Sequence, residues 1–211
     1  MSHSLQVYAH GADNLRKVDH LGKNSPYAQF SLDIHEKKPS FEKTAVKKHA
    51  GENVEWNENL TISNFSPSEH NTLYVEVLDH EILADAVIGY AAIPLRQVAE
   101  AGGNIFRGKF NLFTSKGEQQ GNIDLTIADL KPGQDAHEVS SRPEEKGESQ
   151  IDTTHQHRIK ALVTKEHVSE GAAAAAGILA AAGLAFGAKH VIDHKKAEEA
   201  KKAEEASNPE P

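Results

Sequence analysis

The chain has 211 residues, with 23 basic and 31 acidic side chains and no cysteine. Its formal net charge of −8 argues against a general nucleic-acid-binding surface, and the absence of cysteine excludes disulfide bonds and zinc–thiolate sites. A hydrophobic fraction of 38% is low for a chain that packs throughout, so we expect part of it to lie outside any core. The N-terminus lacks the basic start and long apolar run of a secretory signal, which favours a cytoplasmic protein.

Short segments rich in β-branched and aromatic residues alternate with polar turns between residues 5 and 130. In two of them, 73–79 and 121–130, apolar and polar residues alternate with period two, which is typical of a strand buried on one face. Eight such segments predict an all-β fold, an eight-stranded antiparallel β-sandwich. A short helix is expected over residues 95–102. The predicted strands are residues 5–10, 27–34, 43–48, 59–63, 73–79, 87–95, 108–113 and 121–130.

The composition changes sharply after residue 130. Residues 131–157 are rich in Ser, Glu, Pro and Gly, so they cannot bury enough apolar surface to offset the entropy of ordering. The pair His155 and His157 has no third ligand nearby and is interpreted as a chance spacing rather than a metal site. We assign the sandwich to residues 1–130, a disordered linker to 131–168, an Ala/Gly-rich and Lys/Glu-rich helical tail to 169–206, and a disordered C-terminus to 207–211.

Residues 171–188 carry no charge, and their length is near the minimum for crossing a bilayer. Alanine and glycine dominate this segment, however, and alanine contributes little to membrane insertion. Gly183 and Gly187 have the spacing of small residues that lets helices approach closely. Two interpretations stay open: membrane contact or self-association through this segment, and a partly ordered Ala-rich helix with neither role. The Lys/Glu repeats that follow predict a solvated helix.

Three stretches resemble the C2 domain, the β-sandwich module that docks signalling and trafficking proteins on membranes. They are LQVYAHGADNLRKVDHLGKNSPYAQFSL from Leu5, VEWNENLTI from Val54, and LYVEVLDHEILADAVIGYAAIPL from Leu73. Their order and spacing match the family, and the resemblance covers about residues 5 to 130. The first predicted strand leads directly into the loop that contains Asp19, which is similar to the permuted, type II topology of the family.

The resemblance implies a calcium site at one end of the sandwich, where carboxylates from two loops surround the ion. Ca²⁺ takes six to eight oxygen ligands, and the number of carboxylates tunes the affinity. Ser25 and Ala86 occupy two positions where the family has aspartate, and Asp85 is displaced by one residue. The resemblance therefore implies a degenerate site with no cofactor or only weakly bound Ca²⁺, and Asp19 also suits a metal-free turn ahead of Gly22. The candidate metal ligands are Asp19, Asp79, Glu81 and Asp85.

A second binding surface implied by the resemblance is a basic patch on the concave strands. Lys43 and Lys47 share one face of the predicted strand 43–48, whereas Lys48 points to the other. Basic residues near an anionic membrane contribute about 1 kcal/mol each, so the patch is a candidate site for a lipid headgroup. Lysines that blunt an exposed strand edge explain the same pattern. The candidate lipid-binding residues are Lys37, Lys38, Lys43, Lys47 and Lys48.

An enzyme is not expected, because the sequence shows no nucleophile with a paired base, no glycine-rich phosphate loop and no Cys or His metal cluster. The leading hypothesis is a non-enzymatic C2 adaptor, cytoplasmic and peripheral to membranes, that docks on anionic phospholipid membranes or on a protein partner largely without calcium. One alternative is a calcium-dependent phospholipid-binding module. Another is a protein–protein scaffold with self-association through the tail. No nucleic-acid partner is expected.

Overall fold

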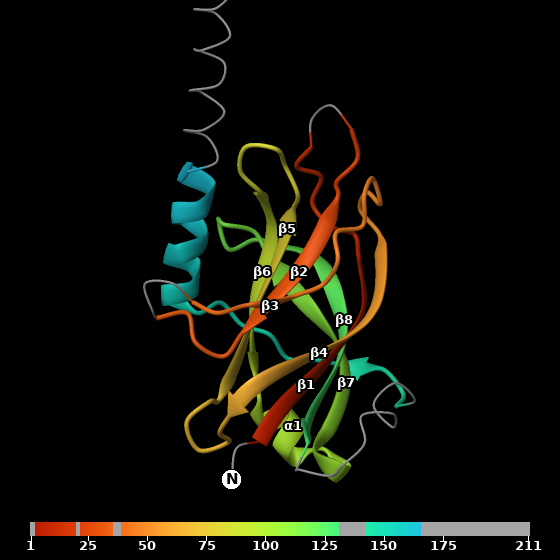
Figure 1. Ribbon diagram of the computed structural model, residues 1–211, viewed down its shortest axis with the longest axis vertical. Helices are drawn as coiled ribbons and strands as arrows, with labels where there is room; N and C mark the ends of the chain where they lie inside the picture. The colour runs from red at the N-terminus through yellow and green to blue at the C-terminus, as the bar shows by residue number, and fades with distance from the viewer. Residues whose placement is uncertain (1–2, 20–21, 36–38, 131–141, 166–211) are drawn as a thin grey trace, which may run out of the picture. The chain divides into compact units, whose positions relative to one another are not determined.

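The computed structural model describes residues 3–19, 22–35, 39–130 and 142–165, and all structural statements below concern these residues (Figure 1). Strands dominate this part of the chain, and the predicted all-β sandwich is confirmed. The elements are β1 (His3–Asp13), β2 (Pro26–Ser31), β3 (Glu42–Lys43), β4 (Val54–Phe65), β5 (Thr72–Asp79), β6 (Ala86–Pro94), α1 (Arg96–Glu100), η1 (Gly102–Asn104), β7 (Ile105–Phe113), β8 (Gln119–Leu130) and β9 (Glu145–Lys146).

The strands form two antiparallel layers. Their hydrogen-bonded order is β3-β2-β5-β6-β7-β8-β1-β4, and β9 pairs in parallel with β7. The β6–β7 contact consists of one pair, Tyr90 and Phe113, so the path folds there into the layers β3-β2-β5-β6 and β7-β8-β1-β4. β1 leads directly into the loop that contains Asp19, and β8 lies between β7 and β1 in the second layer. This order agrees with the type II topology that the sequence predicted.

The core lies between the two layers and follows the period-two pattern of the strands. Leu5 and Val7 of β1 are fully buried, as are Ile123, Leu125 and Ile127 of β8. Alternate residues of a strand point to one face, so each of these strands places its apolar side chains in the same interior. Full burial of one such side chain contributes about 1.5–3 kcal/mol. The shared core fixes the strands whose end loops form the candidate site.

Of the predicted elements, one strand is shorter than expected and the short helix is present. The predicted strand 43–48 is wrong beyond Lys43, because β3 ends there. The Thr44 hydroxyl accepts the N–H of Ala28 at 2.9 Å, so a side chain takes the place of a backbone partner and interrupts the ladder. The predicted helix 95–102 is confirmed as α1 followed by η1. Gly103 has a φ of 74°, a left-handed conformation that favours glycine.

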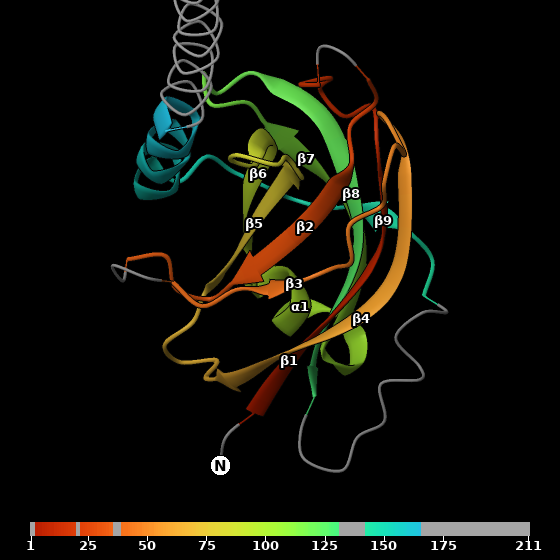
Figure 2. The same ribbon diagram turned by 45° about the horizontal axis from the view of Figure 1, so that its top comes forward.

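The predicted disordered linker is wrong over residues 142–165. β9 pairs with β7, Gln150 exchanges two backbone hydrogen bonds with Ala92, and residues 153–165 are helical. Figure 2 shows this helix, in blue, beside β5 and β6. Ile159 is fully buried, because apolar residues at helical spacing supply a packing face that the polar composition of the region concealed. Residues 131–141 and 166–211, which include the predicted Ala/Gly-rich and Lys/Glu-rich tail and C-terminus, lie outside the described residues.

The described helices are short. Within the part of the chain that the structure describes, no helix is both long and apolar enough to cross a membrane. The predicted membrane contact or self-association of residues 171–188 concerns a segment that lies outside the described residues.

Candidate functional site

The candidate site lies at one end of the sandwich, where the β1–β2 loop and the β5–β6 loop meet (Figure 1). Each of Asp19, Asp79 and Glu81 has a carboxylate oxygen within 4.8 Å of those of the other two. The loops are also joined by backbone atoms, since the N–H of His80 donates to the Ser25 carbonyl at 3.1 Å. Three of the four predicted metal ligands are therefore brought together in space.

Asp79 is the buried member of this acidic cluster (Asp19, Asp79 and Glu81). It ends β5, and its side chain accepts the N–H of Ser25 through Oδ1 at 2.5 Å. Its Oδ2 is buried and has no hydrogen-bond partner among the described residues. Burial raises the pKa of Asp79, and the neighbouring charges of Asp19 and Asp85 raise it further. A buried carboxylate oxygen without a partner is costly, and a bound cation would remove that cost.

Asp19 forms a turn and also lies in the acidic cluster. Its Oδ1 accepts the N–H of Gly22 at 2.8 Å, which is the expected turn. A Cβ on Gly22 would lie 2.7 Å from Asp19 Oδ2, so a larger residue there would push the carboxylate away. Asp19 nevertheless remains within reach of Asp79 and Glu81. The turn fixes the position of the carboxylate and leaves it in the acidic cluster.

Asn24 positions the Asp19 loop and was missed by the sequence analysis. It is 1% exposed. Its Oδ1 accepts the N–H groups of Val18 and Asp19, at 3.1 and 3.2 Å, and its Nδ2 donates to the Arg16 carbonyl at 2.8 Å. The side chain thus ties both ends of the loop together. No signal in the sequence distinguished Asn24 from the polar residues around it.

Asp85 is not part of the acidic cluster, although it was predicted as a ligand. Its Oδ2 accepts the hydroxyl of Tyr27 at 2.7 Å, and its Oδ1 accepts the N–H of Glu81 at 3.1 Å. Burial and the bond to Asp85 raise the pKa of Tyr27 above its ordinary range. Asp85 therefore braces the β5–β6 loop against β2. Ser25, at a family position for aspartate, accepts the N–H of His49 through its hydroxyl at 3.1 Å.

Two exposed apolar residues lie on the same loop as Glu81. The side chains of Ile82 and Leu83 are 99% and 64% exposed. Within the described residues, Ile151 is the one other large hydrophobic residue that is exposed, at 40%. Isolated exposed apolar residues are common, but an adjacent pair at a loop tip beside a charged cluster is typical of an interaction site. This pair was not predicted, because the loop was interpreted only as a source of carboxylates.

The structure does not gather the predicted lysines into one strand patch. Lys43 Nζ lies 5.5 Å from the centre of the Tyr27 ring, and Lys48 is exposed. Lys47 Nζ lies 3.7 Å from Glu58 Oε1, so its charge is partly neutralised. Both Lys47 and Lys48 follow the end of β3, and the predicted common strand face is therefore wrong. Lys37 and Lys38 lie outside the described residues.

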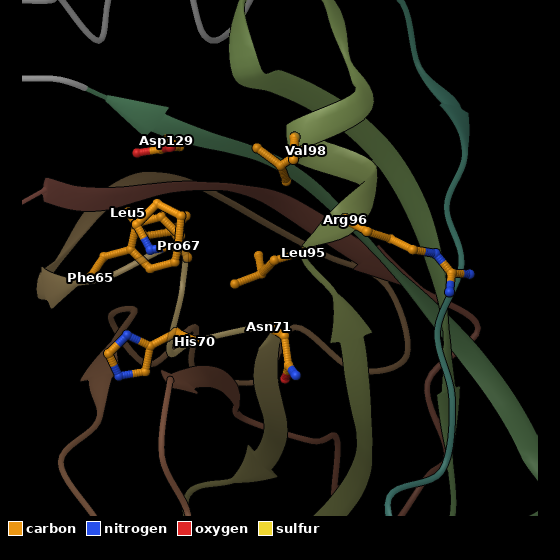
Figure 3. Close-up of a pocket in the computed structure, with 10 residues that line it drawn as sticks. Leu5, Phe65, Pro67, His70, Asn71, Leu95, Arg96, Val98 and Asp129 are labelled. Atoms are coloured by element: carbon orange, nitrogen blue, oxygen red, sulfur yellow. The ribbon is translucent and has the colours of Figure 1, made fainter.

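An apolar pocket lies at the opposite end of the sandwich, between the β4–β5 loop and α1 (Figure 3). Its cavity volume is about 280 Å³, at the lower limit of small-molecule sites. Leu5, Phe65 and Leu95 line it. Arg96 points away from these residues and pairs with Glu148. The cavity is small and its walls are largely apolar, so we attribute this pocket to packing of the β4–β5 loop against α1.

Comparison with known proteins identifies the sandwich. A model of the C2 domain matches residues 3–112. This chain belongs to the C2 domain family. Tricalbin-2 of Saccharomyces cerevisiae is 34% identical over 125 residues, which cover 59% of this chain and 10% of that protein. The chain thus spans about a tenth of the length of this relative.

The same fold occurs in a solved structure. A C2 domain of plant extended synaptotagmin 1 has a TM-score of 0.50 and 23% identity, and the match covers 61% of this chain and 96% of that one. This likeness concerns the fold of the C2 domain.

We expect Asp79→Asn to stabilise the calcium-free C2 domain by on the order of 1 kcal/mol, because it removes a buried charge with an unpaired oxygen. An asparagine oxygen can still accept the N–H of Ser25. Calcium at millimolar concentration should raise the thermal unfolding temperature of the wild type but not of the variant. Circular dichroism melts in chelator and in calcium measure both effects. Glu69→Gln, at an exposed acid in the β4–β5 loop, is the matched control for charge removal. A variant less stable than wild type in chelator would contradict the argument.

Proposed function

We propose that this C2 domain docks peripherally on anionic phospholipid membranes through the acidic loop end, and that calcium bound by Asp19, Asp79 and Glu81 strengthens the contact. The observation that carries the proposal is the exposed pair Ile82 and Leu83 on the loop that also supplies Glu81, beside the unpartnered oxygen of Asp79. The non-enzymatic adaptor role and the cytoplasmic location are parts of the same proposal.

The ligand count supports a shared calcium site. Three carboxylates offer at most six oxygens, and Asp19 Oδ1 and Asp79 Oδ1 already accept backbone N–H groups. Ca²⁺ takes six to eight oxygens, so the protein alone leaves coordination positions open. Lipid phosphate oxygens would fill them. The same count predicts weak calcium binding without a membrane, because fewer carboxylates give lower affinity.

The apolar pair supplies the second part of the contact. Burial of an aliphatic side chain contributes about 1.5–3 kcal/mol, and Ile82 and Leu83 are both exposed before docking. Two such side chains give only reversible membrane binding, since stable anchoring usually requires two signals. Calcium and headgroups would provide the other signal. Lys43 and Lys48, both exposed, would add about 1 kcal/mol each near an anionic leaflet.

The calcium-independent form of the proposal has less support. It depends on the lysines alone, and Lys47 already lies beside Glu58. The predicted strand that would have aligned Lys43 with Lys47 ends at Lys43. A basic surface of this kind would contribute without calcium, but it leaves the unpartnered oxygen of Asp79 and the exposed loop residues without a role.

Vesicle sedimentation tests the proposal. We expect the full chain to bind vesicles of phosphatidylcholine and phosphatidylserine in calcium, and to bind them more weakly in chelator. Leu83→Asp should reduce binding in calcium by about tenfold or more, because an apolar contact is replaced by a charge. Ile151→Ser, at an exposed apolar residue that belongs to neither the β1–β2 loop nor the β5–β6 loop, is the control and should bind as wild type.

The two failures of this experiment have different meanings. No binding to anionic vesicles in either condition would overturn membrane docking. Equal binding in calcium and in chelator, unaffected by Leu83→Asp, would replace the calcium mechanism with the lysine mechanism.

A further inference from the structure

The outer face of the layer β3-β2-β5-β6 is covered by the chain itself. Alternate residues of β5 point to this face, and Tyr74, Glu76 and Leu78 there are nearly or fully buried. The covering element is the helix of residues 153–165, which we call the cover helix (Figure 2). A sheet face that would otherwise meet solvent is thus closed by an element from the far end of the described chain.

The centre of the covered face is negatively charged. The Glu76 side chain is fully buried, and its Oε1 accepts Nε of Arg158 at 2.7 Å and lies 3.3 Å from Nε2 of His155. Its Oε2 accepts Nε2 of Gln29 at 2.5 Å. Burial alone would raise the pKa of Glu76, but the hydrogen bonds from His155 and Arg158 outweigh it and lower this pKa. The two basic side chains that contact the buried carboxylate, His155 and Arg158, both come from the cover helix.

Around Glu76 the face is apolar and aromatic, and the cover helix matches it. Ile159 packs in one cluster with Tyr27, Leu78, Val87 and Tyr90, and Leu162 and Val163 of the helix pack against that cluster. The His155 ring lies edge-on to Tyr74 and Tyr90, with ring centres 5.3 and 4.9 Å apart. Counted from His155, the contacting residues of the cover helix lie at positions i, i+3, i+4, i+7 and i+8. This spacing is that of an amphipathic helix bound in a groove.

The cover helix is held differently from the strands beneath it. Its contacts with the face are made by side chains, whereas β2, β5 and β6 are joined by backbone ladders. The N–H of His155 is capped within the segment, by Oδ1 of Asp152 at 2.8 Å. Elements held by few side-chain contacts open at a lower free energy than core strands. The helix can therefore leave the face while the sandwich stays folded, and Glu76 would then be hydrated.

We propose that the outer face of β2, β5 and β6 is a docking groove for a basic amphipathic helix of a partner protein, and that the cover helix occupies this groove in cis. The partner helix carries a cation for Glu76, as Arg158 does, and apolar residues one, four and five positions later. Charge complementarity identifies this partner, since a carboxylate at the floor repels a phosphate and attracts a guanidinium. This groove adjoins the loops of the proposed membrane contact at Tyr27, whose hydroxyl bonds Asp85, but it contains no member of the acidic cluster.

A peptide of residues 151–165, labelled with fluorescein, is the probe. Fluorescence anisotropy measures its binding to the full chain and to a full-length release variant, Arg158→Ala/Ile159→Ala, whose groove residues are unchanged. We expect the release variant to bind the peptide at least tenfold more tightly than the wild type, in which the cover helix competes. A peptide with Arg158→Glu should bind at least tenfold more weakly, and so should a release variant that also carries Glu76→Gln. Membrane vesicles are absent, so the result is independent of lipid docking.

Three results would overturn the proposal. The first is no saturable binding to a release variant that still unfolds cooperatively. The second is equal affinity of the wild type and the release variant. The third is a wild-type dimer in light scattering that Ile159→Ala dissociates, which would place a second copy in the groove. Hydrogen exchange on the wild type adds a check that needs no variant: amides of the cover helix should exchange at least tenfold faster than those of β5.

Discussion

Changing Arg158 to methionine should detach the cover helix from the sheet while the sandwich remains folded. The change leaves the buried carboxylate of Glu76 without its closest cationic partner, and breaking a buried pair costs about 3–5 kcal/mol. Burial of Ile159, the one fully buried aliphatic side chain of the helix, contributes only about 1.5–3 kcal/mol. Leu162 and Val163 add to this contribution, so the two effects are of similar size, and the fraction of molecules with a released helix and a hydrated Glu76 should rise strongly.

Near-ultraviolet circular dichroism and hydrogen exchange measure the release. Tyr74 and Tyr90 pack against His155, so their signal should change, and amides of residues 153–165 should lose protection. Lys160→Met, at an exposed position of the same helix, is the control and should behave as wild type. The double variant Glu76→Gln/Arg158→Met should regain the attached helix, because no charge is then left unpaired. An Arg158→Met protein with unchanged protection would contradict the argument.

The pair of Glu76 and Arg158 also predicts how the attachment of the cover helix in the wild type depends on acid. The pKa of Glu76 in the folded chain lies below its ordinary value of 4.5, because hydrogen bonds from His155 and Arg158 outweigh burial. The folded state therefore favours the ionised form, and this stabilisation is complete above about pH 4.5. It is lost as the pH falls through the lowered pKa of the folded state. The cover helix should stay attached from neutral pH to about pH 4.5 and detach only in stronger acid.

Asn24→Leu should remove calcium binding and lower the free energy of unfolding by about 2–4 kcal/mol. The side chain satisfies the N–H groups of Val18 and Asp19 and the carbonyl of Arg16 in a buried position. Each buried polar group left unsatisfied costs about 1–3 kcal/mol, and water can reach part of this loop, so the sum is reduced. Loss of these bonds also frees the Asp19 loop, which separates Asp19 from Asp79.

Isothermal titration calorimetry with calcium and thermal unfolding measure the two effects of Asn24→Leu. The control is Asn24→Asp, which keeps the acceptor for Val18 and Asp19 but turns an oxygen toward the Arg16 carbonyl and adds a buried negative charge. It should retain calcium binding and lose about 1 kcal/mol or more of stability. Calcium uptake by Asn24→Leu equal to that of the wild type would show that the loop holds its shape without this side chain.

Local patterns in the sequence predict the strands well, because the alternation in β1, β5 and β8 reflects a core that each strand contacts directly. Such local patterns do not predict the burial of Glu76. Its position on the outer face predicts a solvated carboxylate, yet it is buried by residues 79 and 82 positions later in the chain. A pairing over such a separation leaves no local signal. The polar composition of residues 131–157 also led to the prediction of a disordered linker there.

The candidate site was predicted in part through family resemblance. Asp19, Asp79 and Glu81 meet as the motifs imply, but Asp85 turns to Tyr27. That difference depends on the course of one loop, which sequence spacing does not determine. The predicted common strand face of Lys43 and Lys47 was wrong because β3 ends at Lys43, where the Thr44 hydroxyl takes the place of a backbone partner.

The two outer strands of the sandwich have a consequence for solubility. β3 and β4 each pair on one side only, and the two lie next to each other. Glu58 of β4 bridges them, since its carboxylate accepts the N–H of Ala45 at 2.8 Å and lies 3.7 Å from Lys47 Nζ. Asn57 interrupts β4 with a φ of 54°. An edge that is bridged by a side chain and broken by a left-handed residue is a poor template for a strand of another molecule, so this domain should resist edge-to-edge aggregation at high concentration.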